Sequence, residues 1–296
     1  MEVKQERLEQ CDRWECVLRR VETHMFHSHL TAVVPMPQLH QPTLLMGSLM
    51  LSNLGWSDED IEGVLCSLLL IYHGLAVHDE VELTPSNREE VRQLSVLAGD
   101  FFSSKYYRLL AEMGQYALIQ AFAKAIQTIN ESKARLRSTS VGFSISDDEY
   151  IALQEQIGLA LLYELGEAVD CRTAVSNHVL RQFGRTITIY NEFEKSQQHY
   201  WDFTYMNLLL WRVATPDERR ILGSYSFGDP CDNRLRSLHT KYQISAQLRD
   251  LVSRSLKEFI DVCASVPDRA AQTALERFAS SLANHIQFQR GLVEER

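Results

Sequence analysis

Apolar residues recur every three or four positions along most of the chain, which is the pattern of helices with one buried face. The first run covers residues 8–25, and its apolar members are Leu8, Cys11, Trp14, Leu18, Val21 and Met25. No stretch of alternating apolar and polar residues is convincing, and the only cluster of β-branched residues is Thr186–Tyr190. The pattern therefore predicts an all-α chain.

Helix start signals and chain breakers divide the sequence further. Ser57, Ser146 and Thr215 each stand before an apolar run, with an acidic residue three positions later. This arrangement is typical of a helix N-terminal cap. We expect a helix break at Gly184 and two final helices that are split at Pro267.

No repeat, low-complexity linker or shift in composition separates one part of the chain from another. We therefore expect about ten helices in a single all-helical domain. Along the chain, this domain would consist of an N-terminal helix in residues 1–35, a family-like core in 57–137, central helices in 146–212 and C-terminal helices in 216–292.

Composition changes this picture little but excludes several classes of protein. The chain carries 39 Asp and Glu against 30 Lys and Arg, a formal net charge of −9, which argues against a nucleic-acid binder. The six cysteines form no C-x-x-C pair, so we expect free thiols in a reducing cytoplasm. The longest charge-free apolar stretch in a helical pattern, Val64–Val77, is shorter than the ~20 residues of a membrane span and predicts a buried core helix.

Four short segments carry a resemblance to a known family. They are Leu75–Val81 (LAVHDEV), Arg92–Phe102 (RQLSVLAGDFF), Tyr106–Leu110 (YYRLL) and Ile129–Lys133 (INESK). Their order and spacing resemble the small subunit, component 1, of bacterial heptaprenyl diphosphate synthase, a degenerate relative of the all-trans prenyl diphosphate synthases. The resemblance is close over residues 69–136 and implies an isoprenoid-synthase-like helical bundle.

The segment HDEV stands where the catalytic relatives have their first DDxxD motif. Carboxylates at i, i+1 and i+4 share a helix face and can hold the Mg²⁺ ions that bridge to a diphosphate. Here Leu83 takes the i+4 position, so the third carboxylate is missing. Glu82 at i+3 leaves a distorted metal site as the alternative. We interpret the motif as a solvated or interface-facing helix end and expect no catalytic residue and no metal site in this chain. The residues of this degenerate motif are His78, Asp79, Glu80 and Glu82.

The second aspartate-rich motif of the catalytic relatives has no counterpart. The only Asp-Asp pair, Asp147–Asp148, follows the predicted cap at Ser146 and suits the first turn of a helix. Glu164, Glu167 and Asp170 recur at every third position. A solvated helix face is the favoured interpretation of this trio, and a vestige of the second motif is the alternative.

The distribution of charge also argues against a substrate site in this chain. No Lys or Arg occurs from Val21 to Asn87, and the acidic residues in that window are Glu22, Asp58, Glu59, Asp60, Glu62, Asp79, Glu80 and Glu82. Uncompensated acids would repel a diphosphate. Arg88 and Arg92 lie nearby but do not form an adjacent pair, so we expect no complete substrate site.

The resemblance implies a division of labour between two subunits. A catalytic large subunit, component 2, would bring both aspartate-rich motifs and the Mg²⁺. The complex would elongate farnesyl diphosphate with isopentenyl diphosphate to an all-trans long-chain prenyl diphosphate for the menaquinone side chain. This chain would stabilise its partner and help to shape the channel that holds the prenyl chain. The alternatives are a divergent one-chain prenyl synthase and a non-enzymatic helical adaptor unrelated to isoprenoids.

Five residues around the degenerate motif receive roles on this basis. The resemblance places Ile71, Gly74 and Leu75 where side chains set the channel floor in catalytic relatives, although core packing is the favoured alternative. We assign structural roles to Gly99 and Asp100. We expect the aspartate to be buried and to hold a helix end or a polar neighbour rather than a metal.

Aromatic residues follow directly after this pair. Phe101, Phe102, Tyr106 and Tyr107 would cover a broad face of one helix. Such a face suits a subunit interface, where Tyr and Phe are enriched. An ordinary core is the equally weighted alternative.

Two features near the N-terminus carry weaker signals. His24, His27 and His29 cluster on the first predicted helix, but no carboxylate completes a metal-ligand set. The uncharged residues 23–57 hold several methionines. Burial is the favoured interpretation of this stretch, and peripheral contact with a membrane or a partner is the alternative.

Overall fold

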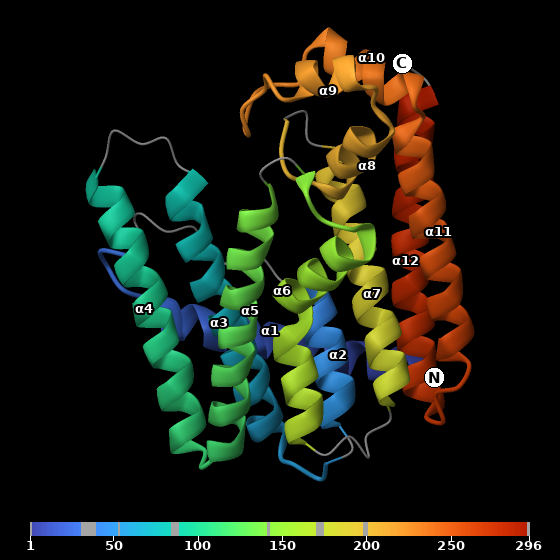
Figure 1. Cartoon of the computed structure of the whole chain (residues 1–296). Helices are drawn as coiled ribbons and strands as arrows, with labels where there is room; N and C mark the ends of the chain where they lie inside the picture. The colour runs from blue at the N-terminus through green and yellow to red at the C-terminus, as the bar shows by residue number, and fades with distance from the viewer. Residues whose placement is uncertain are drawn as a thin grey trace. The chain divides into compact units, whose positions relative to one another are not determined.

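The protein is all-helical in the part of the chain that the computed structural model describes, residues 2–30, 40–52, 54–83, 89–140, 143–169, 175–197 and 201–294. These residues hold twelve helices and no strand (Figure 1). The helices are α1 (Glu2–Met25), α2 (Gln41–Leu51), α3 (Asp58–Leu83), α4 (Glu89–Glu112), α5 (Tyr116–Ser140), α6 (Asp147–Ala168), α7 (Asn177–Lys195), α8 (Tyr205–Val213), α9 (Pro216–Leu222), α10 (Asn233–Lys241), α11 (Ile244–Cys263) and α12 (Arg269–Glu294). The all-α prediction is confirmed.

The chain divides into two compact units. The first consists of Met1–Lys124 and Glu164–Thr173, and the second of Ala125–Tyr163 and Ala174–Arg296. Helices α1 to α4 belong to the first unit and α7 to α12 to the second, while α5 and α6 contribute to both. A single domain stays a prediction.

Helix α3 forms the core of the first unit. It packs along α4 and also contacts α1 and α2, and Figure 1 shows α3 and α4 side by side. Val64, Leu65 and Leu68 have no exposed surface. Among the described helices, the segment Asp58–Asp79 is long and apolar enough to cross a membrane, but 67% of its apolar window is buried inside the structure. The buried core helix that the sequence predicts is therefore confirmed.

The second unit is built around α7, α11 and α12, which run side by side in Figure 1. Phe183 of α7 contacts Phe259 of α11 and Phe278 of α12, with ring centroids 5.7 and 5.8 Å apart. Phe183 and Phe259 are fully buried. Burial of such large rings is the main source of packing free energy in a helical core.

The three predicted helix caps are present. The backbone N–H groups of Asp60 and Glu149 donate to the hydroxyls of Ser57 and Ser146, both at 3.1 Å. Thr215 forms a complete capping box with the residue three positions on, and Pro216 follows it at the first helical position. These side chains satisfy amide groups that would otherwise lack a partner at the start of α3, α6 and α9.

The predicted break at Gly184 is wrong, because this glycine lies inside α7. A Cβ at Gly184 would collide with the hydroxyl of Tyr163 and stand 3.0 Å from its Cζ atom. The Tyr163 hydroxyl donates to Glu155 at 2.5 Å. Glycine is therefore needed at this position to admit a neighbouring ring, and not to end the helix. The β-branched cluster Thr186–Tyr190 also lies within α7.

Two further boundaries differ from expectation. Three helices follow residue 232 rather than two, because Gln243 takes a left-handed backbone conformation (φ 51°) between α10 and α11. Pro267 separates α11 from α12 as predicted. Helix α1 ends at Met25, so His27 and His29 lie beyond the helix on which the sequence placed them.

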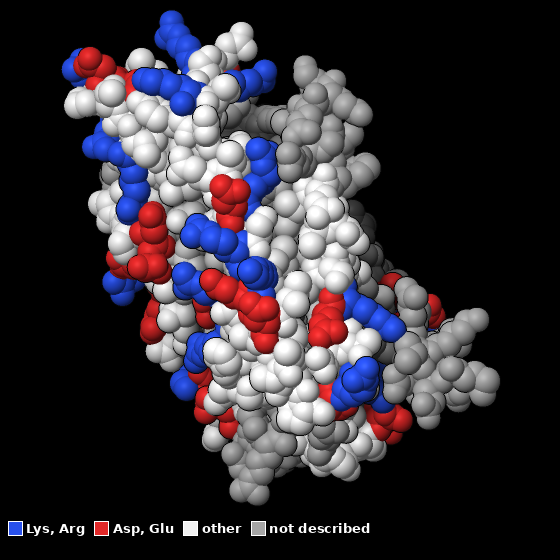
Figure 2. Space-filling view, turned by 90° about the vertical axis from the view of Figure 1, so that its right-hand side faces the viewer, with Lys and Arg blue, Asp and Glu red and all other residues white. Residues whose placement is uncertain are grey.

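Charged side chains of both signs mix on the surface. On the face that Figure 2 shows, Lys and Arg side chains lie between Asp and Glu side chains and alternate with uncharged areas. The drawn residues of that face form no continuous basic stripe. A mixed surface of this kind does not attract a polyanion strongly.

Candidate functional site

The degenerate motif lies near the C-terminal end of α3, where this helix packs closely on α4. Gly74 of α3 faces the α4 backbone, and a Cβ added there would stand 3.3 Å from the carbonyl oxygen of Gly99 and 3.6 Å from the hydroxyl of Ser103. One turn further along, the ring of His78 fills the space beside Gly99. The two glycines therefore allow α3 and α4 to approach at this point, and a role of Gly74 in a channel stays a prediction.

The carboxylate of Asp100 faces the imidazole of His78 across the two helices. Its Oδ1 lies 3.6 Å from Nε2, and the side chain of Asp100 is 70% exposed. The expectation that Asp100 is buried is wrong, because the residue lies on the outer face of α4. The pair can form a solvated ion pair when the histidine is protonated, and such pairs contribute little to stability.

The remaining acids of the degenerate motif are only partly described. Asp79 is exposed, and the side chains of Glu80 and Glu82 lie outside the described residues. No group of three or more His, Cys, Asp or Glu that could hold a metal occurs among the residues whose placement is known. The described residues therefore do not fit a divalent cation at this helix end.

The predicted aromatic face of α4 divides into buried and exposed parts. Phe102 and Tyr106 belong to the core and are 1% and 2% exposed, and burial raises the pKa of Tyr106 to about 12. Phe101 is half-buried, with the Lys105 ammonium 4.5 Å from its ring centroid. Tyr107 is 47% exposed. Only the half-buried and exposed members offer surface to a partner, and their role at an interface stays a prediction.

The channel candidates beside Gly74 also differ in exposure. Ile71 is 2% exposed and belongs to the core, while Leu75 is half-buried. Of this trio, Leu75 is the residue that keeps surface to contact a bound chain, and its role also stays a prediction.

A second site, which the sequence did not indicate, is a hollow of about 380 Å³ between α6 and α7 in the second unit. Its size is within the range of small-ligand sites. Its walls combine apolar and polar side chains. The lining residues are Gln154, Ile157, Gly158, Leu159, Thr188, Asn191, Glu192 and Lys195.

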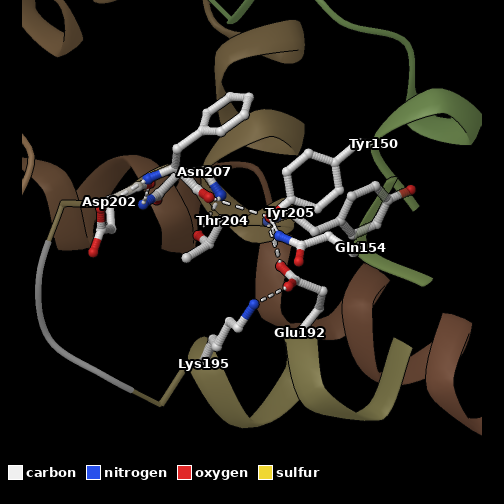
Figure 3. Close-up of polar contacts among 9 residues, drawn as sticks. Tyr150, Gln154, Glu192, Lys195, Asp202, Thr204, Tyr205 and Asn207 are labelled. Carbon is white, nitrogen blue, oxygen red and sulfur yellow. Dashed lines mark hydrogen bonds and ion pairs between the residues drawn. The ribbon is translucent and has the colours of Figure 1, made fainter. Parts of the chain in front are cut away.

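Glu192 is the buried polar centre of this hollow, with 1% of its side chain exposed. Figure 3 shows three donors that converge on its carboxylate. The Tyr150 hydroxyl donates at 2.9 Å, the Tyr205 backbone N–H at 2.8 Å and the Lys195 ammonium at 2.7 Å. Burial and the nearby carboxylate raise the pKa of Tyr150. Donors from α6, α7 and α8 thus satisfy the charge of Glu192 without a metal.

The segment that enters α8 is held by further hydrogen bonds, which Figure 3 also shows. The side-chain amide of Asn207 donates to the carbonyl oxygen of Asp202 at 2.8 Å. The Thr204 hydroxyl accepts from the backbone N–H of Asn207 and caps the helix. These contacts fix the position of the Tyr205 amide, which points at Glu192.

The acids weighed in the search for a second motif lie away from this hollow. Glu164 pairs with Lys124 at 2.9 Å, and Glu167 is exposed, while Asp170 lies outside the described residues. Asp147 pairs with Arg212 at 3.2 Å and lies with Asp148 in the first turn of α6. The sequence reasoning missed Glu192 because a lone glutamate with a lysine three positions later resembles an ordinary exposed helix pair.

Comparison with solved structures defines the class of the fold. The chain resembles a decaprenyl diphosphate synthase from Rhodobacter capsulatus, with a TM-score of 0.74 at 14% identity over 96% of this chain and 98% of the other. It also resembles a polyprenyl synthase from Caulobacter crescentus CB15, solved with calcium and isoprenyl diphosphate, with a TM-score of 0.74 at 16% identity over 95% and 97% of the two chains. The chain therefore has the isoprenoid-synthase fold.

Sequence comparison then gives the family. The profile of heptaprenyl diphosphate synthase subunit 1 matches residues 27–205, more than half of the chain, and the protein belongs to this family. A curated relative, heptaprenyl diphosphate synthase component 1 of Geobacillus stearothermophilus, is 40% identical over 92 residues. That alignment covers 31% of this chain and 41% of the relative. The resemblance inferred from the sequence is confirmed.

Proposed function

We propose that this chain is the small, non-catalytic subunit of a two-component heptaprenyl diphosphate synthase. Its partner is a large subunit that carries both aspartate-rich motifs and the Mg²⁺. Together they elongate farnesyl diphosphate with isopentenyl diphosphate in the cytoplasm to a long-chain prenyl diphosphate for the menaquinone side chain. The observation that carries this proposal is membership of the subunit 1 family in a chain whose first motif lacks the third carboxylate.

The second unit supports a non-catalytic role for the same chain. Glu192, the buried carboxylate of the α6–α7 hollow, is already bound by Lys195 and two further donors. A carboxylate in this state is not available to a magnesium diphosphate. This state of Glu192 supports the assignment of diphosphate ionisation to the partner.

Exposed apolar residues on α4 and α5 support a contact with the partner. Val96 and Leu97 are 41% and 57% exposed, and Tyr107 and Tyr116 are 47% and 66% exposed. Exposed apolar and tyrosine side chains are typical of protein interfaces. We assign the partner contact to this group of residues.

The direct test is reconstitution. The purified chain, the large subunit and their mixture are each assayed with farnesyl diphosphate and radiolabelled isopentenyl diphosphate, and the products are separated by chain length. Long-chain product from the mixture alone is expected. Product from this chain alone would favour a divergent one-chain synthase. Failure to bind or activate any partner with the DDxxD motif would favour a helical adaptor.

Two matched substitutions test the assigned interface. Leu97→Glu places a charge in the proposed contact and should weaken complex formation and the activity of the mixture by tenfold or more. Ile260→Glu makes the same change at a residue of α11 that is 40% exposed, and it should leave both unchanged. Equal effects of the two variants would remove α4 from the interface.

Leu75 provides a test of the channel. A Leu75→Phe variant in the complex should shorten the main product if this half-buried side chain lines the path of the prenyl chain. An unchanged product length in a fully assembled complex would assign the channel to the partner alone.

A further inference from the structure

The hollow between α6 and α7 contains a charge pair whose negative member is almost completely buried. Glu192 is 1% exposed, while the side chain of Lys195 is 42% exposed and its ammonium lies 2.7 Å from the carboxylate. The pair brings no net charge into the hollow. A buried carboxylate without a counter-charge would be strongly destabilising, and the Lys195 ammonium supplies a counter-charge at this place.

Neutral oxygen-bearing side chains surround the pair. The hydroxyl of Thr188 is buried, with the residue 3% exposed, and has no hydrogen-bond partner among the residues that the structure describes. The amide side chains of Gln154 and Asn191 line the same hollow. Carboxylate, amide and hydroxyl oxygens are ligands of hard divalent cations such as Mg²⁺ and Ca²⁺. The hollow therefore offers oxygen ligands, and an ammonium group occupies the position next to its carboxylate.

We infer that the Lys195 ammonium takes the place of a divalent cation in this hollow. It neutralises Glu192 so that the second unit folds without a metal, and it prevents a metal from binding beside the carboxylate. The lysine can do this because its ammonium is a compact charge with three donors on a flexible stem. The inference concerns this chain alone and stands whether or not the proposed partner exists.

Exchange of the lysine for an acidic residue tests the inference. Lys195→Asp removes the ammonium and adds a carboxylate three positions from Glu192, on the same helix face. The variant should be less stable than the wild type in EDTA, because two carboxylates then face each other in the hollow. Millimolar Mg²⁺, Mn²⁺ or Ca²⁺ should raise its thermal midpoint by several degrees through preferential binding to the folded state. The wild type should show no such response.

Two controls separate this site from general effects of charge. Glu192→Gln combined with Lys195→Asp leaves one carboxylate in the hollow and should lose most of the response to cations. Lys124→Asp makes the same exchange at an exposed lysine that pairs with Glu164, and it should respond weakly or not at all.

Direct binding completes the test and covers variants that fold poorly. Electron paramagnetic resonance should detect about one bound Mn²⁺ per chain in Lys195→Asp and none in the wild type. If the variant is recovered unfolded in EDTA, refolding by Mn²⁺ is the expected result, and Lys195→Met provides a milder form of the experiment. The inference is wrong if neither variant binds or responds to cations more strongly than Lys124→Asp.

Discussion

The imidazole ring of His78 on α3 lies directly against the backbone of Gly99 on α4. Its Cε1 and Cδ2 atoms are 2.6 and 2.7 Å from the position that a Cβ would occupy. We expect Gly99→Ala to lower the free energy of unfolding by about 1–3 kcal/mol, because either the ring or one helix must move. Urea denaturation of the isolated chain measures this change.

A matched glycine distinguishes packing from helix propensity. At Gly158 of α6, no neighbouring side chain of the described residues lies within 4 Å of the place that a Cβ would take, so Gly158→Ala should raise the free energy of unfolding by about 0.5–1 kcal/mol. Adding His78→Ala to Gly99→Ala should recover part of the loss. Equal stabilities of the two single glycine variants would contradict the role of the His78 contact.

Gly184 and Tyr163 form a second such pair, within the second unit. Gly184→Ala should cost about 1–3 kcal/mol, because the new methyl group would collide with the phenol ring. Removing only the hydroxyl with Tyr163→Phe relieves the closest contact. The double variant should therefore be more stable than Gly184→Ala alone, and thermal denaturation of all three variants tests this order. A double variant less stable than Gly184→Ala would show that the hydroxyl is not the cause.

The hydrogen bonds of the Glu218 side chain predict that the folded protein loses stability in acid. Its carboxylate accepts hydrogen bonds from Lys241, Thr215 and Tyr242, and these donors lower its pKa from 4.5 to about 2. The unfolded chain binds the proton more readily than the folded chain between these values. The contribution of Glu218 is therefore complete above pH 4.5 and disappears as the pH falls through about 2. Glu218→Gln should show a smaller fall of the thermal midpoint across this interval than the wild type.

The burial of His239 predicts a second pH dependence of stability, at a pH closer to neutrality. Burial lowers its pKa from 6.5 to about 4, and neither ring nitrogen has a hydrogen-bond partner among the described residues. The unfolded chain takes up a proton in this interval while the folded chain stays neutral. Stability should therefore fall from pH 6.5 to 4 by about 3 kcal/mol and then level off.

A substitution isolates this histidine. His239→Leu should remove that part of the pH dependence, and it should not destabilise the protein at pH 7, because it replaces two buried unpartnered nitrogens by apolar atoms. Urea unfolding at pH 7 and pH 5 provides the comparison. An unaltered pH profile in His239→Leu would disprove the assignment.

Local sequence determines much of the helical structure. Ser57, Ser146 and Thr215 mark helix starts correctly because a cap depends on residues within one turn. The buried position of α3 also follows from its own apolar length. Segments of this kind are predictable because the residues that determine them are adjacent in the chain.

Features that depend on distant residues were not predictable. Gly184 looked like a helix break because nothing near it in sequence indicates that Tyr163 packs against it. The sequence did not indicate Glu192, which is buried because Tyr150 and Tyr205 approach from other helices. Asp100 looked buried beside two phenylalanines, but it lies on the outer face of α4. In each of these cases the sequence does not show which face of a helix is covered by a neighbouring helix.

The carboxylate of Glu192 joins α6, α7 and the first residue of α8 in one hydrogen-bonded group. These elements therefore cannot open independently, because separating any one of them leaves a buried anion without a donor. The Tyr205 amide proton, which points at this anion, should be among the slowest in the chain to exchange with deuterium. Its exchange rate would report the cooperative opening of the three helices in a single signal.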